Sequence, residues 1–370
     1  MTRKLRRWFA KVELARVTPE RQHDGSMHKN ANGDIETAPP HAQLVQMAHA
    51  HWVSHIAYVA AKLSLADHLA NGPKSAEEVA RETNSHAHSL YRLMRTLANL
   101  GILTEDEAHC FALTPLGEAL KTGAPGSARA TILTIASEWW VHGFGHLLYS
   151  VQTGKSGFEK ALGMPIFDWL ASHPEDASLF SETMIGFHGA EPAAVAAAYD
   201  FSGLTTIVDV GGATGHLLTT ILTDYPSARG ILFDLPHVVR DAPALIEGRG
   251  LTDRVNIEVG NFFESVPSGG DAYLLSHIIH DWSEGQCLTI LENCRRAMNS
   301  GGRLLIIEMV LPPGNTPHPG KMLDMMMLVG PGGQERTEEE YGALLGKAGL
   351  RLTRVAPTES PVSVVEARAC

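Results

Sequence analysis

Three side chains that could move a proton lie at or near predicted strands in the C-terminal half of the chain. His280 follows one strand, Glu308 lies in the next, and Glu335 lies in the run Gly-Gly-Gln-Glu-Arg-Thr. An isolated histidine is more often a core residue, but a carboxylate at the end of a buried sheet needs a partner. Because carboxylates beside a histidine orient its ring and raise its basicity, we predict that these residues form a site.

A glycine-rich loop follows an earlier predicted strand. It reads Asp-Val-Gly-Gly-Ala-Thr-Gly, from Asp209 through Gly211 and Gly212 to Gly215. A dinucleotide-binding loop has the spacing G-x-G-x-x-G, which this loop does not match. The carboxylate of Asp209 would also repel a pyrophosphate, whereas it suits a ligand that carries an ammonium group.

The next two strands end in groups that suit a nucleoside. Asp234 ends one strand, where its carboxylate can accept two ribose hydroxyl groups. Asn261 and Phe262 follow the other strand and offer an amide for an adenine edge and an aromatic face beside it. Together with the loop, these groups predict a phosphate-free nucleoside that carries an amino acid, which is S-adenosylmethionine.

The elements that must position these groups are strands and helices that alternate from about residue 204 onwards. The predicted strands cover residues 206–210, 230–234, 255–259, 272–276, 303–310, 350–355 and 362–366. Helices are predicted at 217–222, from a capping box at Ser283 to Met298 with its end at Gly301 and Gly302, and from a capping box at Thr337 to near Gly349. This pattern predicts an α/β fold with a doubly wound, mostly parallel sheet, whose ligands bind at the carboxyl ends of the strands.

The N-terminal region has helical rather than alternating periodicity. Trp52, Ile56, Val59 and Leu63 share one helix face, which we predict to be buried. A helix opened by a capping box at Ser75, a second helix and a hairpin follow, which is the order of a winged helix. Such a unit either binds DNA or mediates dimerisation, and the acidic chain favours dimerisation.

Composition supports a folded, multidomain chain. The 370 residues are 44% hydrophobic and 19% charged, with 30 Lys and Arg against 41 Asp and Glu, or a net charge of −11. This balance argues against nucleic acid or an anionic membrane as a partner. The four cysteines form no C-x-x-C pair, which fits free thiols in a reducing cytoplasm. We predict no stable membrane association.

Residues 1–40 are predicted to form a flexible basic and polar tail. Its first 21 residues hold seven Lys and Arg against Glu13 and Glu20. A frayed tail is the favoured interpretation. A surface-binding or targeting helix is the alternative, because Leu5, Phe9 and Val12 could share one face.

The ordered motifs resemble the plant-type and bacterial O-methyltransferase family, which includes caffeate, hydroxyindole, carminomycin and phenazine methyltransferases. The motifs are the loop at 209–215, Phe-Asp-Leu-Pro at 233–236, Gly-Asn-Phe-Phe-Glu at 260–264, His-Asp-Trp at 280–282 and the run at 332–337. The resemblance implies a helical, winged-helix-like dimerisation and substrate-lid domain at 41–195. It also implies a class I methyltransferase domain at 196–370, with a Rossmann-like doubly wound sheet, and a homodimer formed through the N-terminal domain.

The resemblance also implies roles for individual residues. His280 is the expected catalytic base, with Glu308 and Glu335 orienting its ring, and no metal is expected. The expected cofactor-binding residues are Asp209, Gly211, Gly212, Gly215, Asp234, Leu235, Asn261, Phe262, Ser276 and His277. The expected substrate-binding residues are Trp140, Met184, His188, Asp281 and Met327, in a pocket between the domains.

Three positions depart from the family pattern. Asn261 stands where the family usually has Asp, which leaves an uncharged acceptor for the adenine amino group. Ser276 stands where plant members often have Lys. Ala213 replaces a glycine of the loop, and alanine fits there only if its φ angle is negative.

The predicted function is S-adenosylmethionine-dependent methylation of a hydroxyl group, most simply a phenol, on a small aromatic secondary metabolite. N- or C-methylation on the same fold is one alternative. A winged-helix regulator that senses a nucleoside is another, and a dinucleotide oxidoreductase is disfavoured by the loop spacing. His51 and His55 are four residues apart and could hold a metal, but a solvated or interfacial helix face is the favoured interpretation.

Overall fold

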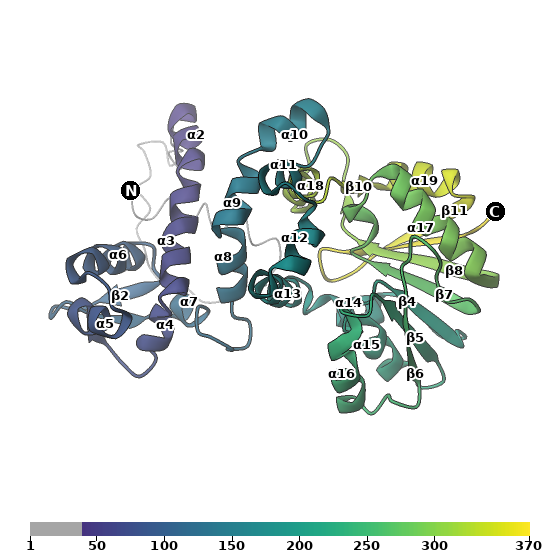
Figure 1. Ribbon diagram of the computed structural model, residues 1–370, viewed down its shortest axis with the longest axis horizontal. Helices are drawn as coiled ribbons and strands as arrows, with labels where there is room; N and C mark the ends of the chain where they lie inside the picture. The colour runs from purple at the N-terminus through teal and green to yellow at the C-terminus, as the bar shows by residue number, and fades with distance from the viewer. Residues whose placement is uncertain (1–38) are drawn as a thin grey trace, which may run out of the picture. The chain divides into compact units, whose positions relative to one another are not determined.

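The computed structural model describes residues 39–370, which fall into two compact units (Figure 1). The first unit ends at Ser137 and the second covers Glu138–Cys370. The predicted basic tail lies almost entirely outside the described residues. The predicted domain boundary after residue 195 stays a prediction. Within residues 39–370, no helix has both the length and the hydropathy that a membrane span requires.

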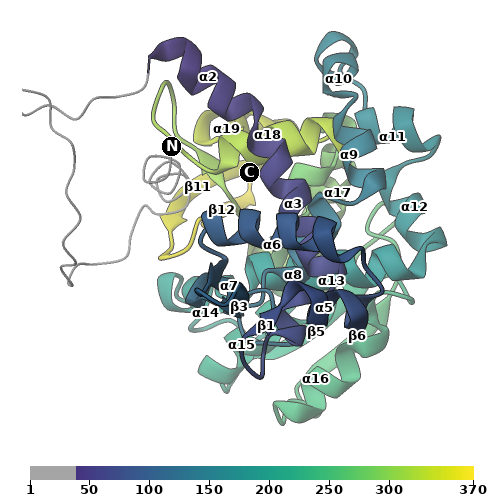
Figure 2. The ribbon, with the colours of Figure 1, turned by 90° about the vertical axis from the view of Figure 1, so that its left-hand side faces the viewer.

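The first unit is mainly helical and contains one small sheet. The sheet has the strand order β1-β3-β2, with both pairings antiparallel. Figure 2 faces this unit. Its elements are α2 (Pro40–Ala48), α3 (Ala50–Lys62), α4 (Leu65–His68), β1 (Lys74–Ser75), α5 (Ala76–Thr83), α6 (Ala87–Asn99), β2 (Leu103–Glu105), β3 (Cys110–Leu113), α7 (Pro115–Glu118) and α8 (Arg129–Ile135).

The predicted helix, helix, hairpin order of this unit is confirmed. Ser75 caps α5 as predicted, because its side chain accepts the N–H of Glu78 while the Glu78 carboxylate accepts the N–H of Ser75. The core beneath α5 and α6 includes Val79, Met94 and Leu97, each with no exposed surface.

The predicted burial of the first helix face is wrong. Trp52 is 55% exposed and Val59 is 40% exposed on α3, whereas Ile56 on α3 and Leu63 directly after it are half-buried. Only Ala60 and Ala61 of α3 are buried, and α2 has no buried residue. Periodicity shows which side chains share a face, but it does not show whether the chain itself covers that face.

The second unit contains a seven-stranded sheet in the order β11-β12-β8-β7-β4-β5-β6. Helices come first: α9 (Glu138–Phe144), α10 (Leu147–Thr153), α11 (Gly157–Leu162), α12 (Ile166–Ser172), α13 (Pro174–His188) and α14 (Glu191–Ala198). The alternating part follows with β4 (Thr206–Val210), α15 (His216–Asp224), β5 (Arg229–Asp234), η1 (Val239–Asp241), α16 (Ala242–Gly248), β6 (Val255–Val259), β7 (Gly270–Ser276), η2 (Ile279–Asp281), α17 (Glu284–Ala297), β8 (Met298–Glu308), β9 (Val310–Leu311), α18 (Gly320–Val329), β10 (Arg336–Thr337), α19 (Glu338–Lys347), β11 (Leu350–Pro357) and β12 (Ser363–Ala369).

This sheet is doubly wound and mostly parallel, as predicted. The strands from β6 to β8 pair in parallel, and β12 is antiparallel to both β8 and β11. The chain moves outward from β4 through β5 to β6 and then returns to the other side of β4 as β7. The order therefore reverses between β4 and β7, which is where such sheets bind ligands.

Alternate residues of the strands pack into two hydrophobic cores, one on each face of the sheet. Ile207 and Leu232 pack with α14, α15 and α16 on one face, whereas Val208 and Phe233 pack with α17 and α19 on the other. Figure 1 shows these two helical layers on opposite sides of the sheet. Because both faces are covered, the strands are apolar throughout, as the sequence indicated.

The predicted helix end at Gly301 and Gly302 is wrong. Helix α17 ends at Ala297, and both glycines lie within strand β8, which begins at Met298. Gly301 has a φ of 79°, and the β7–β8 register shifts at this point. A glycine with a positive φ often ends a helix. Here, such a glycine instead forms an irregularity within strand β8. The capping boxes at Ser283 and Thr337 are confirmed.

Candidate active site

His280 lies in η2, the single turn that follows β7, and its ring is held by carboxylates from elsewhere in the chain. Its Nδ1 donates to Oε1 of Glu335 at 2.6 Å, and its backbone N–H donates to Oε1 of Glu308 at 3.1 Å. All three residues are buried, with relative exposures of 6% or less. The structure therefore brings together the three residues that the sequence singled out.

The segment that carries Glu335 is fixed against η2 through its backbone. The N–H of Gln334 donates to the carbonyl of His280 at 2.9 Å, and Nη1 of Arg336 donates to the carbonyl of Ile279 at 3.2 Å. The approach is so close that a Cβ on Gly333 would lie 1.9 Å from the carbonyl oxygen of His280. Only glycine can occupy this position, which explains one glycine of the run at 332–337.

Glu308 has both carboxylate oxygens on protein donors. One accepts the N–H of His280, and the hydroxyl group of Tyr341 donates to the other in a short hydrogen bond. Burial, followed by the charge of Glu308, raises the pKa of Tyr341 well above its usual value. Glu308 therefore anchors the backbone of η2, and the ring of His280 is oriented by Glu335.

The carboxylates determine the protonation of His280. Burial by itself would lower the pKa of His280, but the neighbouring carboxylates, Asp281 first, outweigh it and raise the pKa to about 10. Burial raises the pKa of Asp281 to about 6 against the opposing charge of His280. Nε2 of His280 lies 3.7 Å from Asp281, too far for a hydrogen bond. Since Nδ1 donates to Glu335, Nε2 is the nitrogen that can accept a proton.

The loop after β4 covers a buried carboxylate that has no strong partner. Both oxygens of Asp209 are buried, and the described part of the chain offers them no well-formed hydrogen bond. Burial, followed by the charge of Asp234, raises the pKa of Asp209 to about 7. A Cβ at Gly212 would lie 2.5 Å from the carboxyl carbon of Asp209, so the loop can pass over it only as glycine.

Asp234, at the end of β5, differs from Asp209 because both of its carboxylate oxygens accept hydrogen bonds. Its two oxygens accept the backbone N–H groups of Ala213 at 3.0 Å and of Leu235 at 2.7 Å. Ala213 has a φ of 49°, so the statement that alanine fits at this position only with a negative φ is wrong. The left-handed conformation costs roughly 1–2 kcal/mol, and it directs the N–H of Ala213 at the carboxylate.

The remaining predicted cofactor residues also lie at strand ends. Asn261 and Phe262 follow β6, where the side-chain oxygen of Asn261 accepts the N–H of Phe263 at 3.0 Å. The ring of Phe262 packs edge-on against Trp282, with 5.9 Å between ring centroids. Ser276 ends β7 and His277 follows it. The fold therefore brings every predicted cofactor residue to the carboxyl ends of β4 to β7.

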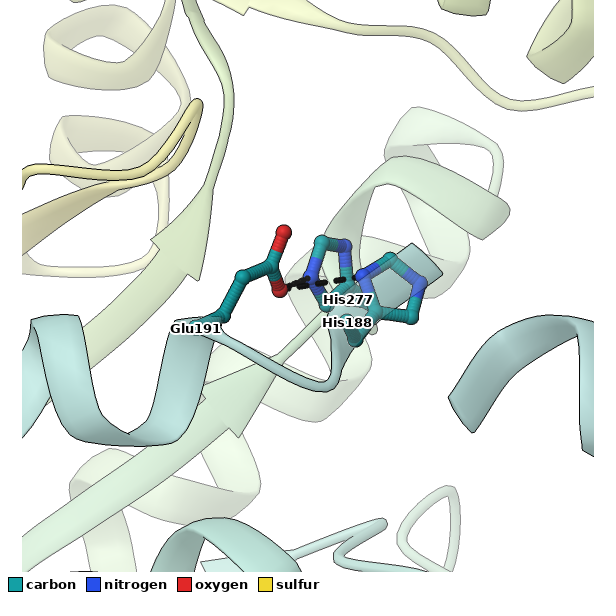
Figure 3. Close-up of side chains that lie close together, drawn as sticks. All are labelled: His188, Glu191 and His277. Carbon is teal, nitrogen blue, oxygen red and sulfur yellow. Dashed lines mark hydrogen bonds and ion pairs between the residues drawn. The ribbon is translucent and has the colours of Figure 1, made fainter. Parts of the chain in front are cut away.

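A second histidine cluster lies beside His280 and was missed by the sequence analysis. Nε2 of His277 and Nδ1 of His188 both donate to the same oxygen of Glu191, at 2.7 and 3.0 Å (Figure 3). Burial by itself would raise the pKa of Glu191, but the hydrogen bonds from His188 and His277 outweigh it and lower it to about 2. The ring centroids of His277 and His280 are 5.3 Å apart. The only local signal was the His-x-x-Glu spacing at 188–191.

The predicted substrate residues are found in different surroundings. Trp140 packs against Phe158 in an aromatic cluster, with ring centroids 5.3 Å apart. Met184 is half-buried on α13, and Met327 of α18 is 8% exposed. A cavity of about 530 Å³ beside α18 is lined by Glu335 and Met325, among others, but not by His280. Their contact with a substrate stays a prediction.

Comparison with known proteins gives two family matches. Residues 144–351 match the O-methyltransferase domain, and residues 45–123 match the O-methyltransferase dimerisation domain. The phenazine O-methyltransferase PhzM of Lysobacter antibioticus is 44% identical over 91% of this chain and 98% of that protein. An 8-amino-8-demethylriboflavin N,N-dimethyltransferase of Streptomyces davaonensis is 34% identical over 85% of this chain and 92% of that protein.

A solved structure agrees with these matches. It is that of the neocarzinostatin-biosynthesis O-methyltransferase NcsB1, in complex with S-adenosylmethionine and 2-hydroxy-5-methyl naphthoic acid. It is 33% identical, covers 86% of this chain and 96% of that chain, and superposes with a TM-score of 0.78.

Proposed function

This chain belongs to the S-adenosylmethionine-dependent O-methyltransferase family, and from that premise we propose that it methylates a phenolic hydroxyl group with His280 as the general base. The single observation that carries the proposal is the hydrogen bond from Nδ1 of His280 to Glu335. It holds the ring in the tautomer whose Nε2 can accept a proton.

The strand ends of the second unit fit the cofactor. Asp209 offers a buried carboxylate without a well-formed partner, which suits the ammonium group of the methionine portion. Asp234 has one backbone donor on each oxygen and so keeps lone pairs for ribose hydroxyl groups. Asn261 and Phe262 would take the adenine end. When bound, the cofactor supplies an electrophilic methyl group.

His280 supplies the other half of the chemistry. A phenol with a pKa near 10 is only about 0.1% ionised at pH 7, so its proton must be removed. The neighbouring carboxylates raise the pKa of His280 above its usual value, so its neutral imidazole is a stronger base for the phenolic proton than a free histidine is. A positioned base of this kind contributes about 10²–10⁴-fold to the rate.

We propose a small, planar, hydroxylated aromatic acceptor. The named substrates of the relatives, a phenazine, a riboflavin derivative and a naphthoic acid, are fused aromatic compounds. Met184, Met327 and Trp140 offer the adaptable and flat surfaces that such rings need. His188 and Asp281 are the polar candidates for binding it.

Two further parts of the proposal concern the assembly and the compartment. The matched dimerisation domain and the exposed apolar face of α3 support a homodimer through the first unit. The four cysteines are free thiols, which supports a reducing cytoplasm as the compartment.

The test is methyl transfer to a matched panel of acceptors. Purified chain and S-adenosylmethionine are incubated with hydroxylated phenazines and naphthoic acids and with their amino analogues, and products are identified by mass spectrometry. The hydroxyl compounds should gain a methyl group on oxygen. Methylation of the amino analogues alone would overturn O-methylation in favour of N-methylation, and a melting temperature raised by NAD but not by S-adenosylmethionine would overturn the cofactor assignment.

A further inference from the structure

Next to the proton-transfer site, three side chains converge on one point, and we propose that His188, Glu191 and His277 bind a divalent transition-metal ion of the zinc class. This inference goes beyond the proposed function, which needs no metal. It rests on the donor set, the spacing and exposure of the donor groups, and the two separate parts of the fold that supply them.

The donor atoms are already close together. One ring nitrogen of His188, one carboxylate oxygen of Glu191 and one ring nitrogen of His277 all lie within 4.8 Å of one another. The two nitrogen-to-oxygen distances are 3.0 and 2.7 Å. In a tetrahedral zinc site with bonds of about 2.0–2.1 Å, neighbouring donor atoms lie about 3.3 Å apart, so shifts of well under an ångström in these two distances would admit an ion.

The donor set is one that zinc uses. Two imidazoles and one carboxylate leave a fourth coordination position open, as in sites that keep a water molecule. The side chain of Glu191 is 7% exposed and that of His277 is 13% exposed, whereas His188 is 28% exposed. The more exposed His188 leaves a route by which an ion and a water molecule can enter.

Two separate parts of the fold supply the donors. Glu191 begins α14, three residues after His188 ends α13, and His277 comes 86 residues later, at the end of β7. His277 has a φ of 54°, and among residues 39–370 its buried Nδ1 has no partner, so within that part of the chain Glu191 provides the only hydrogen bond of its ring. An ion at this point would tie the α13–α14 connection to the end of β7.

The neighbouring cluster of His280, Glu308 and Glu335 provides an internal contrast. Its donor atoms also lie within 4.8 Å of one another. However, both oxygens of Glu308 already accept protein donors, and all three side chains are buried. We therefore assign the ion to the cluster at Glu191, where only the two imidazoles occupy the carboxylate.

The experiment titrates chelator-treated chain with Zn²⁺ alone and follows binding by calorimetry, with Co²⁺ absorption as a second measurement of the coordination geometry. The unmodified chain should bind one equivalent. His188→Ala and Glu191→Gln should each weaken that binding at least about 100-fold, since even residues that only support metal ligands change affinity by 10–100-fold. Glu335→Gln and His51→Ala are the matched controls and should bind Zn²⁺ as the unmodified chain does.

Three outcomes would overturn the proposal: no stoichiometric binding, unchanged affinity in both His188→Ala and Glu191→Gln, or an equal loss in Glu335→Gln. Thermal melts without metal establish that each variant is folded before titration. The result is independent of the proposed function, because methyl transfer in the presence of chelator tests that function separately.

Discussion

The ends of β4 and β5 and the ends of β7 and β8 both hold buried carboxylates, but they treat them in opposite ways. At β4, the oxygens of Asp209 have no well-formed hydrogen bond. At β8, both oxygens of Glu308 are occupied, one by the N–H of His280 and the other by the hydroxyl group of Tyr341. The carboxylate of Asp209 is left for a ligand to bind. The carboxylates of Glu308 and Glu335 instead hold the backbone and the ring of His280 in place.

The difference has an energetic basis. Burying a carboxylate without partners favours its protonated form, and the pKa of Asp209 is raised to about 7 by burial and by Asp234. Around His280 the carboxylates instead stabilise a positive charge and raise its pKa to about 10, although burial opposes this. Burial of the Asp209 carboxylate is therefore unfavourable until a ligand binds, whereas the ring of His280 is already oriented for proton transfer before a ligand binds.

The largest expected effect comes from removing the imidazole ring of His280. His280→Ala should lower kcat by about 10²–10⁴-fold, because the acceptor proton loses its base. The affinity for S-adenosylmethionine, measured by calorimetry, should stay unchanged because the groups proposed for its ammonium, ribose and adenine portions lie at the ends of β4, β5 and β6. His109→Ala, at a side chain that is 73% exposed in the hairpin of the first unit, is the control. Undiminished turnover in His280→Ala would end the general-base assignment.

A smaller effect is expected when the ring stays and its orienting carboxylate is neutralised. Glu335→Gln should lower kcat/KM by about 10–100-fold, the worth of a hydrogen bond to a charged group at about 1.5–3 kcal/mol. The substitution should also change the pH profile. In the unmodified chain the rate should rise towards pH 10 as His280 loses its proton, because the pKa of His280 is raised to about 10.

Without the Glu335 charge the pKa of His280 falls, so the rise in kcat/KM should be complete at a lower pH. Steady-state kinetics from pH 6 to 10 measure both effects. Identical profiles for the two proteins would show that Glu335 does not act through the ring.

The smallest change in rate is expected for a substitution of Asp209, which should instead change the free energy of unfolding. The folded pKa of Asp209 is raised, so the folded state holds a proton that the unfolded state has lost, and stability falls as pH rises from about 4 to 7. Asp209→Asn removes this penalty and should stabilise the cofactor-free chain at pH 8 by between about 1 and 4 kcal/mol. Thermal melts at pH 5 and pH 8 measure the gain, which should be clearly smaller at pH 5 because the penalty builds up between about pH 4 and pH 7.

The same substitution should weaken binding of S-adenosylmethionine, since the proposed ammonium contact loses its charge. If Asp209→Asn is neither stabilised at pH 8 nor impaired in cofactor binding, then Asp209 is not a buried carboxylate left for the cofactor to bind.

Sequence patterns predicted most of the second unit because the relevant signals are local. The capping boxes at Ser283 and Thr337 involve residues three apart, and continuous apolar runs predicted strands covered on both faces. The same local logic failed at Gly301, where a left-handed glycine lies in a strand rather than at the end of a helix. It also failed at Ala213, whose positive φ is set by its contact with Asp234.

The sequence by itself determined which residue types stand at the strand ends, because a parallel sheet brings the residue after each strand to one edge. His280 and Glu308 could be grouped on that ground, whereas Glu335 follows no strand of the sheet and was singled out by its place in the run at 332–337. Only the tertiary structure decided which partner each group takes, such as Glu191 for His277 across 86 residues. It also decided that Trp52 is exposed. Hydrogen bonds and burial depend on what the folded chain brings alongside, and a helical or strand pattern carries no information about that neighbour.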